Sequence, residues 1–188
     1  VYADRFEGLA AIIASTQMNI VTAHIEGGDI TEGGALDDNV RHAMTKLAHF
    51  HFTTNPEASK RIIAMGEERW RVKTIGYPAV DLIKEKNYAN QYELMEKFKL
   101  NINDKVIVFT QHSITTEYQK SLNQLKISLK ALEKIAKNNT KVIITYPNND
   151  IGSDLIVKYL KNKKYKNNKN ILIYKSIGRY YYHGLLAL

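Results

Sequence analysis

Three acidic side chains stand where the chain turns from one expected element to the next. Asp4 precedes a helical pattern, Glu26 follows the β-prone run from Ile20 to Ile25, and Asp37 opens the next helix. Carboxylates crowded into a partly desolvated cleft have their pKa values pushed apart, so that one can accept a proton while another donates one. The arrangement is therefore typical of proton transfer to and from carbon. It also permits a simpler interpretation, in which Asp4, Asp37 and Asp38 only cap helices.

A cation and an imidazole extend this set. Arg41 lies four residues after Asp37, on the same face of the expected helix, where its guanidinium could pair with that carboxylate or hold a diphosphate. His112 follows the very apolar run from Val106 to Thr110, and we interpret it as a contact to substrate or phosphate. Histidines in His24-x-Glu26 and His49-x-His51 could also ligate a metal, but no third well-spaced ligand completes a set, so we predict no metal site.

The expected strands alternate regularly with helices, and this alternation places polar residues at the ends of strands. Ligands in parallel sheets bind beyond the carboxyl ends of the strands. Five polar segments follow expected strands: Asp4-Arg5, Glu26-Gly27-Gly28, Gly76-Tyr77-Pro78, Gln111-His112 and Pro147-Asn148. The alternation predicts doubly wound α/β architecture, with residues 1–83 in one lobe, and with a polar hinge from Lys84 to Asn90 opening a second lobe over residues 84–188.

Composition narrows the class of protein. Residues 1–85 carry 9 basic and 12 acidic side chains, a formal charge of −3, whereas residues 86–188 carry 18 and 7, a charge of +11. Lysines interleaved with asparagines, as from Lys161 to Asn170, are typical of a solvated loop, so we predict no nucleic-acid partner.

No apolar run could span a membrane and no leader is visible, which favours a cytoplasmic protein. Because the chain has no cysteine, catalysis must use oxygen and nitrogen groups. It starts at Val1, where a strand should be ending, so we expect sequence to be missing before it.

Five segments match sequence motifs of one known family. Ala3 to Glu7 resembles a GDRFE turn, and His24 to Asp29 resembles an HIEGGE or HIHGGD strand exit. The stretch from Asp37 to His49 is similar to a DDxxRHxxTKxxH helix. Tyr146 to Ser153 and Lys175 to Tyr181 are similar to YPNxDxGS and KSLGxxxY segments. Together these segments resemble the hydrolysing UDP-N-acetylglucosamine 2-epimerases of sialic and legionaminic acid biosynthesis, and the resemblance covers essentially the whole chain.

The resemblance implies two Rossmann-like lobes of the GT-B type, both incomplete here, that hold a nucleotide sugar. The implied reaction eliminates UDP across C1 and C2 of the sugar and then adds water with inversion at C2, without metal or redox cofactor. Asp4, Glu26 and Asp37 would handle protons, although which of them deprotonates C2 is left open. Arg41 and His112 would contact the diphosphate and leaving group, and further substrate contacts would come from Arg5, His42, Asn148 and Ser176.

Two departures from the family pattern bear on specificity. Ala3 replaces the usual glycine, which we interpret as mild because alanine is small. The loop between Glu26 and Asp37, with its Thr31-Glu32-Gly33-Gly34 run, is longer than in simple members, which leaves open a UDP-diacetamido-trideoxy sugar or a GDP sugar as substrate. The alternatives are a non-hydrolysing 2-epimerase or an inactive nucleotide-sugar-binding module. By resemblance the whole enzyme is expected to be a homodimer or larger homo-oligomer, and the 188 residues alone are expected to be inactive.

Overall fold

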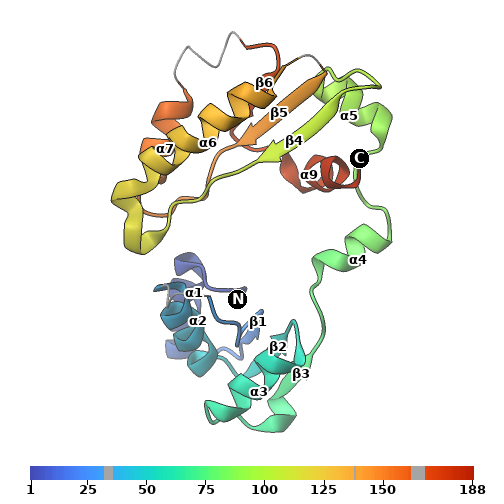
Figure 1. The fold of residues 1–188 in the computed structure, drawn as a ribbon. Coiled ribbons are helices and arrows are strands. Elements are labelled where there is room, and N and C mark those ends of the chain that lie inside the picture. Colours follow the sequence, from blue (N-terminus) through green and yellow to red (C-terminus); the bar gives the residue numbers. More distant parts are fainter. Residues whose placement is uncertain (32–35, 138, 162–167) are drawn as a thin grey trace. The chain divides into compact units, whose positions relative to one another are not determined.

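The chain divides into two compact units, which are Val1–Asp81 and Leu82–Leu188. The structure is a computed structural model and describes residues 1–31, 36–137, 139–161 and 168–188. Each unit contains a three-stranded parallel sheet with helices packed against it (Figure 1). This is the α/β architecture that the alternation of strands and helices predicts.

The first unit contains a parallel sheet in the order β1-β2-β3. Its elements are α1 (Phe6–Gln17), β1 (Ala23–Ile25), α2 (Leu36–Leu47), β2 (Phe50–Thr53), α3 (Pro56–Ala64), the 3-10 helix η1 (Arg69–Arg71), β3 (Val72–Thr74) and the start of α4 (Ala79–Lys84). Tyr2 forms a parallel bridge to Ile25, so the segment before α1 extends the sheet beyond β1. The carboxyl ends of this segment, β1 and β2 therefore share one edge.

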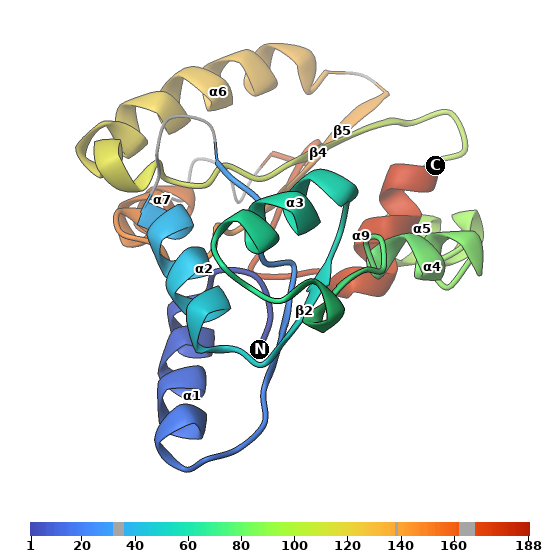
Figure 2. The same ribbon diagram turned by 90° about the horizontal axis from the view of Figure 1, so that it is seen from below.

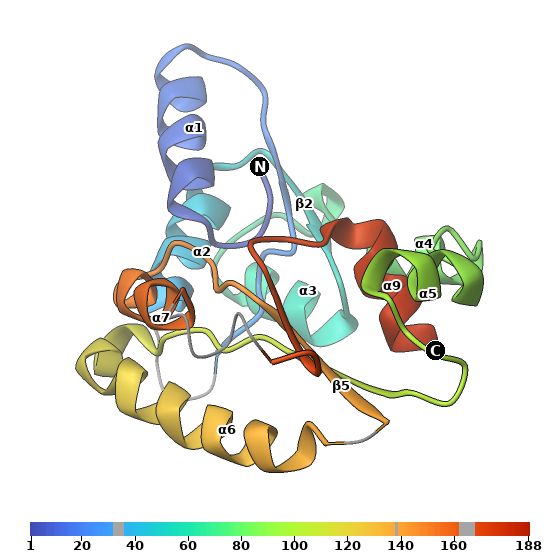
Figure 3. The ribbon, with the colours of Figure 1, turned by 90° about the horizontal axis from the view of Figure 1, so that it is seen from above.

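A small apolar core joins α1 to α2. Ile12 of α1 packs with Met44 and Ala48, and α1 lies next to α2 in the opposite views from below and above (Figures 2 and 3). Strand β1 starts at Ala23, three residues later than the β-prone run from Ile20 predicts. Pairing with β2 sets this start, because Ala23 lies opposite Phe50, the first residue of β2.

The second unit repeats the pattern with the sheet order β4-β5-β6. Its elements are α5 (Gln91–Phe98), β4 (Lys105–Phe109), the 3-10 helix η2 (Thr115–Lys120), α6 (Ser121–Ile135), β5 (Thr140–Thr145), α7 (Ser153–Leu160), β6 (Ile171–Tyr174) and α9 (Gly178–Ala187). Val142 and Ile144 of β5 pack with the leucines of α6, whereas Ile143 packs with α5 and α9. Successive side chains of a strand point to opposite faces, so both faces of this sheet are covered by helices.

Candidate active site

Arg41 is the centre of a polar cluster in the first unit. Its residue is only 8% exposed, and its Nη1 donates to Asp38 Oδ1 at 2.8 Å and to the carbonyl oxygen of Asp29 at 2.9 Å. Its Nη2 forms an ion pair with Asp4 Oδ2. Asp38 is the second residue after the start of α2, and Asp4 follows the edge segment that pairs with β1. The guanidinium therefore ties a helix, a loop and a strand end together.

Asp38 takes part in this cluster as an ionised group. Burial acts to raise its pKa, but hydrogen bonds from Thr31, including its backbone N–H at 2.8 Å from Asp38 Oδ1, and the positive charge of Arg41 outweigh burial. The pKa of Asp38 is thus held below its usual value. The charge on this carboxylate favours the ion pair with Arg41 at neutral pH.

The loop after β1 is also held by the two residues that follow β2 and by α3. The carboxylate of Asp29 accepts hydrogen bonds from the Thr54 hydroxyl at 3.0 Å and from the Asn55 amide at 3.1 Å. Arg61 of α3 donates to the carbonyl oxygen of Gly28. Asn55 also caps α3 by accepting from the Ala58 N–H at 2.8 Å. These contacts fix the loop that begins at Glu26.

Glu26 leaves β1 in the left-handed backbone region, with φ of 64°. Its N–H donates to the Phe52 carbonyl oxygen at 2.9 Å, and its carboxylate accepts a hydrogen bond from the Tyr2 hydroxyl. Burial, and next the hydrogen bond to Glu26, raise the pKa of the Tyr2 phenol, so the phenol stays protonated at neutral pH. A non-glycine residue in this conformation is typical of strained functional sites.

His24 is a fully buried, neutral residue that supports the site. Its Nε2 lies 2.7 Å from the Ala3 carbonyl oxygen and its Nδ1 lies 3.1 Å from Thr45 Oγ1. Burial lowers its pKa to about 4. A Cβ on Gly27 would lie 2.8 Å from His24 Nδ1, so glycine is needed there to let the loop close over the imidazole. His24 is thus used as a structural group rather than as a metal ligand.

The second unit has polar groups at the matching edge of its own sheet. His112 follows β4 and is exposed, and its Nδ1 accepts from the Asn148 backbone N–H at 3.3 Å. The Asn148 side chain donates to Asp150 at 3.1 Å. The strand exits of β4 and β5 therefore meet through His112 and Asn148.

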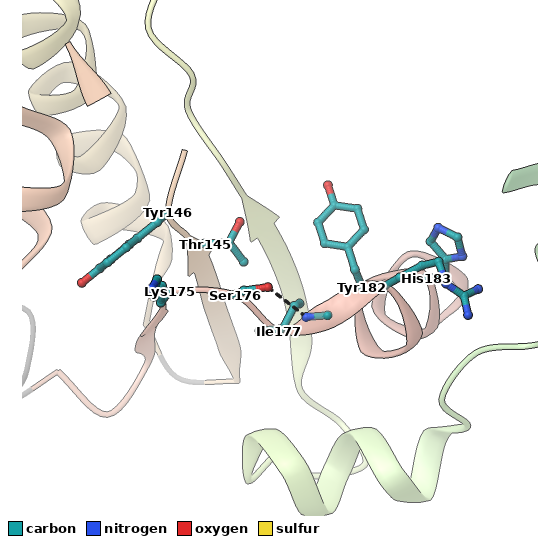
Figure 4. A pocket seen from close by; sticks show the side chains of 9 residues that line it. Thr145, Tyr146, Lys175, Ser176, Ile177, Tyr182 and His183 are labelled. Atoms are coloured by element: carbon teal, nitrogen blue, oxygen red, sulfur yellow. Dashed lines mark hydrogen bonds between the residues drawn. The ribbon is translucent and has the colours of Figure 1, made fainter. Parts of the chain in front are cut away.

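A pocket of about 320 Å³ opens beside the carboxyl ends of β5 and β6 (Figure 4). Ser176 lies on its wall and its Oγ accepts from the Gly178 N–H, at the start of α9, at 3.2 Å. The pocket is lined by Thr145, Tyr146, Lys175, Ser176, Ile177, Gly178, Arg179, Tyr182 and His183. Cations and an aromatic ring around one cavity suit an anionic, ring-containing ligand.

Comparison with known proteins decides the family. The family model described as UDP-N-acetylglucosamine 2-epimerase matches residues 1–188. The chain belongs to this family. It is 30% identical over 185 residues to a Campylobacter jejuni GDP/UDP-N,N'-diacetylbacillosamine 2-epimerase (hydrolyzing), matching 98% of this chain and 47% of that protein. It is 32% identical to a Neisseria meningitidis UDP-N-acetylglucosamine 2-epimerase, over 99% of this chain and 47% of that one.

Solved structures in this family have the same fold. The Neisseria meningitidis UDP-GlcNAc 2-epimerase bound to UDP-GlcNAc has a TM-score of 0.75 at 18% identity, over 100% of this chain and 51% of that one. A Methanocaldococcus jannaschii UDP-GlcNAc 2-epimerase in complex with UDP-GlcNAc and UDP has a TM-score of 0.70 at 17% identity, over 100% and 51%. The prediction of two Rossmann-like lobes is confirmed. The chain spans about half the length of the relatives that it matches.

The structure joins some of the candidate residues and separates others. In the first unit, Asp4 and Arg41 are in contact, but the described ion pair from α2 to Arg41 comes from Asp38 rather than from Asp37, which is exposed. The chemical roles given to Asp4, Glu26, Asp37, Arg41 and His112, and to Arg5, His42, Asn148 and Ser176, stay predictions. Most of the Thr31 to Gly34 run lies outside the described residues.

Two substrate-contact candidates in the first unit have contrasting surroundings. Nδ1 of half-buried His42 is inaccessible to solvent and has no hydrogen-bond partner among the described residues. Arg5 precedes α1 and pairs with Glu7 at 3.4 Å. An unpaired buried nitrogen costs free energy, so His42 carries an unsatisfied polar atom, whereas Arg5 is partly exposed and paired.

Several residues at these sites were not among the predicted site residues. Tyr2, Asp29, Thr54 and Arg61 hold the first cluster, and Lys175, Arg179, Tyr182 and His183 line the pocket beside Ser176. Over the described ranges, no group of three His, Asp or Glu side chains is placed to hold a metal ion. Nor does any helix within those ranges have the length and apolarity to cross a membrane.

Proposed function

We propose that the whole protein is a hydrolysing UDP-N-acetylglucosamine 2-epimerase, which converts UDP-N-acetylglucosamine and water to N-acetylmannosamine and UDP for sialic-acid-like sugars. The observation that carries the proposal is the carboxyl edge of the first sheet, where the buried guanidinium of Arg41 pairs with Asp4 and the carboxylate of Glu26 accepts from Tyr2. Family membership supports the same reaction class.

Proton transfer at C2 is the step for which this edge is suited. A base removes the C2 proton, the C–H electron pair forms the C1–C2 double bond, and the C1–O bond breaks so that UDP leaves. Water then adds its oxygen to C1 while a proton returns to C2 on the opposite face, which inverts C2. Carboxylates can take and return that proton, and no net oxidation occurs. The substrate and products balance without a redox cofactor.

The nucleotide is proposed to contact the second unit. Lys175 and Arg179 supply positive charge beside the pocket next to Ser176, and Tyr182 supplies a ring on which a base can stack. His112, exposed after β4, is proposed to contact the diphosphate as UDP leaves. Negative charge develops on the leaving UDP, so positive or hydrogen-bonding groups at this position would lower the barrier.

A second candidate substrate is a diacetamido-trideoxy sugar linked to UDP or GDP. It is favoured by two relatives of 30% and 29% identity, from Campylobacter jejuni and Legionella pneumophila, that are named diacetylbacillosamine 2-epimerases (hydrolyzing). Both candidates share the elimination and differ in the substituents at C4 and C6. A non-hydrolysing 2-epimerase differs in returning UDP to the sugar.

UDP release by a form of the protein that spans the full length of its relatives tests the proposal. We expect release from UDP-N-acetylglucosamine, and a loss of at least about a hundredfold in the Glu26→Gln variant, because proton transfer by one group contributes that much or more. Glu96→Gln, at an exposed position of α5, is the matched control. Epimerised sugar nucleotide without free UDP would identify a non-hydrolysing enzyme, and release only from UDP- or GDP-diacetylbacillosamine would establish the second candidate.

The 188 residues by themselves are expected to release UDP far more slowly than the longer form, because a substrate loses positioning when parts of the protein are absent. Equal turnover would refute this. We further propose that the whole enzyme acts in the cytoplasm as a homodimer or larger homo-oligomer, as the resemblance implies.

A further inference from the structure

The backbone on both sides of the Tyr2–Glu26 contact is fixed by the sheet. Ile25 donates to the Val1 carbonyl oxygen at 3.0 Å and accepts from the Ala3 N–H at 2.8 Å. These bonds hold Tyr2 between two anchored residues, and the bond from the Glu26 N–H to Phe52 anchors the acceptor. The phenol and the carboxylate are therefore brought together by strand pairing rather than by a flexible loop.

Glu26 and Asp4 have different partners although they leave neighbouring strands. Asp4 is held by the cation Arg41, with side-chain exposures of 23% and 10% in the pair. Glu26 is held by the neutral Tyr2 phenol, and Tyr77, which follows β3, also interacts with that phenol. A cation brings an opposing charge to the carboxylate that it holds, whereas a neutral donor orients the carboxylate without one.

The second oxygen of Glu26 is the one left to meet a substrate. The phenol engages Oε1, and the Tyr2 residue is 46% exposed, so this contact lies at the surface of the unit rather than in its core. An anchored donor on one oxygen restricts rotation of the carboxylate about its last torsion. The other oxygen is then presented in a fixed direction, as general-base catalysis requires.

We propose that Tyr2 is a positioning residue that orients Glu26 as the base that removes the C2 proton of the sugar. This inference rests on the proposed function and deepens it by assigning the base. Glu26 takes the proton, the electron pair of the C2–H bond forms the C1–C2 double bond, and UDP departs with the electrons of the C1–O bond. Tyr2 keeps its own proton throughout and acts on the reaction only through Glu26.

Tyr2→Phe in the full-length form tests the inference, because it removes the donor and keeps the ring. We expect kcat for UDP release to fall about 10- to 100-fold with KM changed less than about twofold, since misplacing a catalytic group costs on the order of a hundredfold. With substrate deuterated at C2, the isotope effect on kcat should increase, because proton removal becomes more rate-limiting. Tyr92→Phe, at a position that is 74% exposed in α5, should match the unsubstituted enzyme.

Two measurements keep this inference separate from the proposed function. An active enzyme whose kcat and isotope effect are unchanged by Tyr2→Phe would overturn the positioning role, as would a change in KM alone. In the 188-residue chain, absorbance titration of the phenol, with the Tyr2→Phe curve subtracted, should show that Glu26→Gln lowers the Tyr2 pKa; no change would overturn the contact. Absence of UDP release from any tested nucleotide sugar by the unsubstituted enzyme would overturn the proposed function, and with it the assignment of Glu26 as base.

Discussion

Ala3 occupies a backbone conformation that suits glycine, with φ of 53°. Its N–H donates to Ile25 and its carbonyl oxygen accepts from His24, so the chain cannot relax out of this conformation without breaking contacts. The family pattern has glycine at this position. We interpreted the replacement as mild from the size of alanine, but the dihedral angle, and not the volume, determines its cost.

Ala3→Gly is therefore expected to stabilise the protein by about 1 kcal/mol, because relief of left-handed strain exceeds the added entropy of the unfolded chain. Urea unfolding measures this as a higher midpoint. Ala14→Gly in α1 is the control and should destabilise by about 1 kcal/mol, since glycine is unfavourable within helices. A midpoint that falls in both variants would show that Ala3 is not strained.

Residue types could be read from the sequence more easily than residue partners. Helical spacing places both Asp37 and Asp38 within reach of Arg41, so periodicity alone does not choose between them. The partner Asp4 lies 37 residues away and is brought in by the pairing of the edge segment with β1. Tyr2 belongs to no chemical pattern, and only strand pairing places it against Glu26.

At the scale of elements, the loop after β1 packs closely against α3 because Gly28 has no side chain. Gly28 has φ of 83°, and a Cβ there would lie 2.5 Å from the Ala58 carbonyl oxygen and 2.8 Å from Ile62 Cγ1. Ala58 and Ile62 are fully buried, so neither can move aside at low cost. Glycine at positions 27 and 28 is therefore needed for close packing within the protein itself.

Gly28→Ala and Gly66→Ala separate the steric cost from the conformational one. Gly66 also has a positive φ, of 97°, but a Cβ there meets no atom within 4 Å. We expect Gly66→Ala to lose about 1 kcal/mol from the left-handed backbone alone. Gly28→Ala should lose roughly 1–3 kcal/mol more, as overpacked sites do. Equal losses in urea unfolding would contradict the packing of this loop on α3.

Elements themselves were predicted well where apolar runs and caps agree. The helix from Pro56 follows Asn55, whose side chain caps it, and the apolar run from Val106 to Thr110 supplies most of β4, as expected. The start of β1 and the 3-10 helix from Thr115 to Lys120 were not predicted. A local sequence pattern predicts the bounds of an element when those bounds depend only on the element's own residues. The start of β1 depends instead on where its neighbour β2 begins.

At the scale of the whole molecule, the two units differ in how they should respond to acid. The first unit contains His24 and His51, both fully buried. Burial lowers the pKa of His24 to about 4, and it lowers the pKa of His51 against the opposing effect of Glu67. In the second unit, by contrast, His112 is exposed and His183 is partly buried. Protonation of buried imidazoles is thus a cost carried by the first unit.

The first unit should lose stability as the pH falls from about 6.5, where an unfolded histidine titrates, to about 4, where folded His24 titrates. The folded state binds fewer protons than the unfolded state in this window, so its free energy of unfolding decreases with falling pH, by about 3 kcal/mol from His24 at pH 4. Trp70, the single tryptophan, packs edge to face on Phe50 in this unit and reports its unfolding by fluorescence, while circular dichroism follows both units. His24→Gln keeps an amide that can bond to Ala3 and Thr45, and it should remove this part of the pH dependence. Equal pH dependence in the variant and in the unsubstituted protein would mean that His24 is not the group whose neutrality the fold requires.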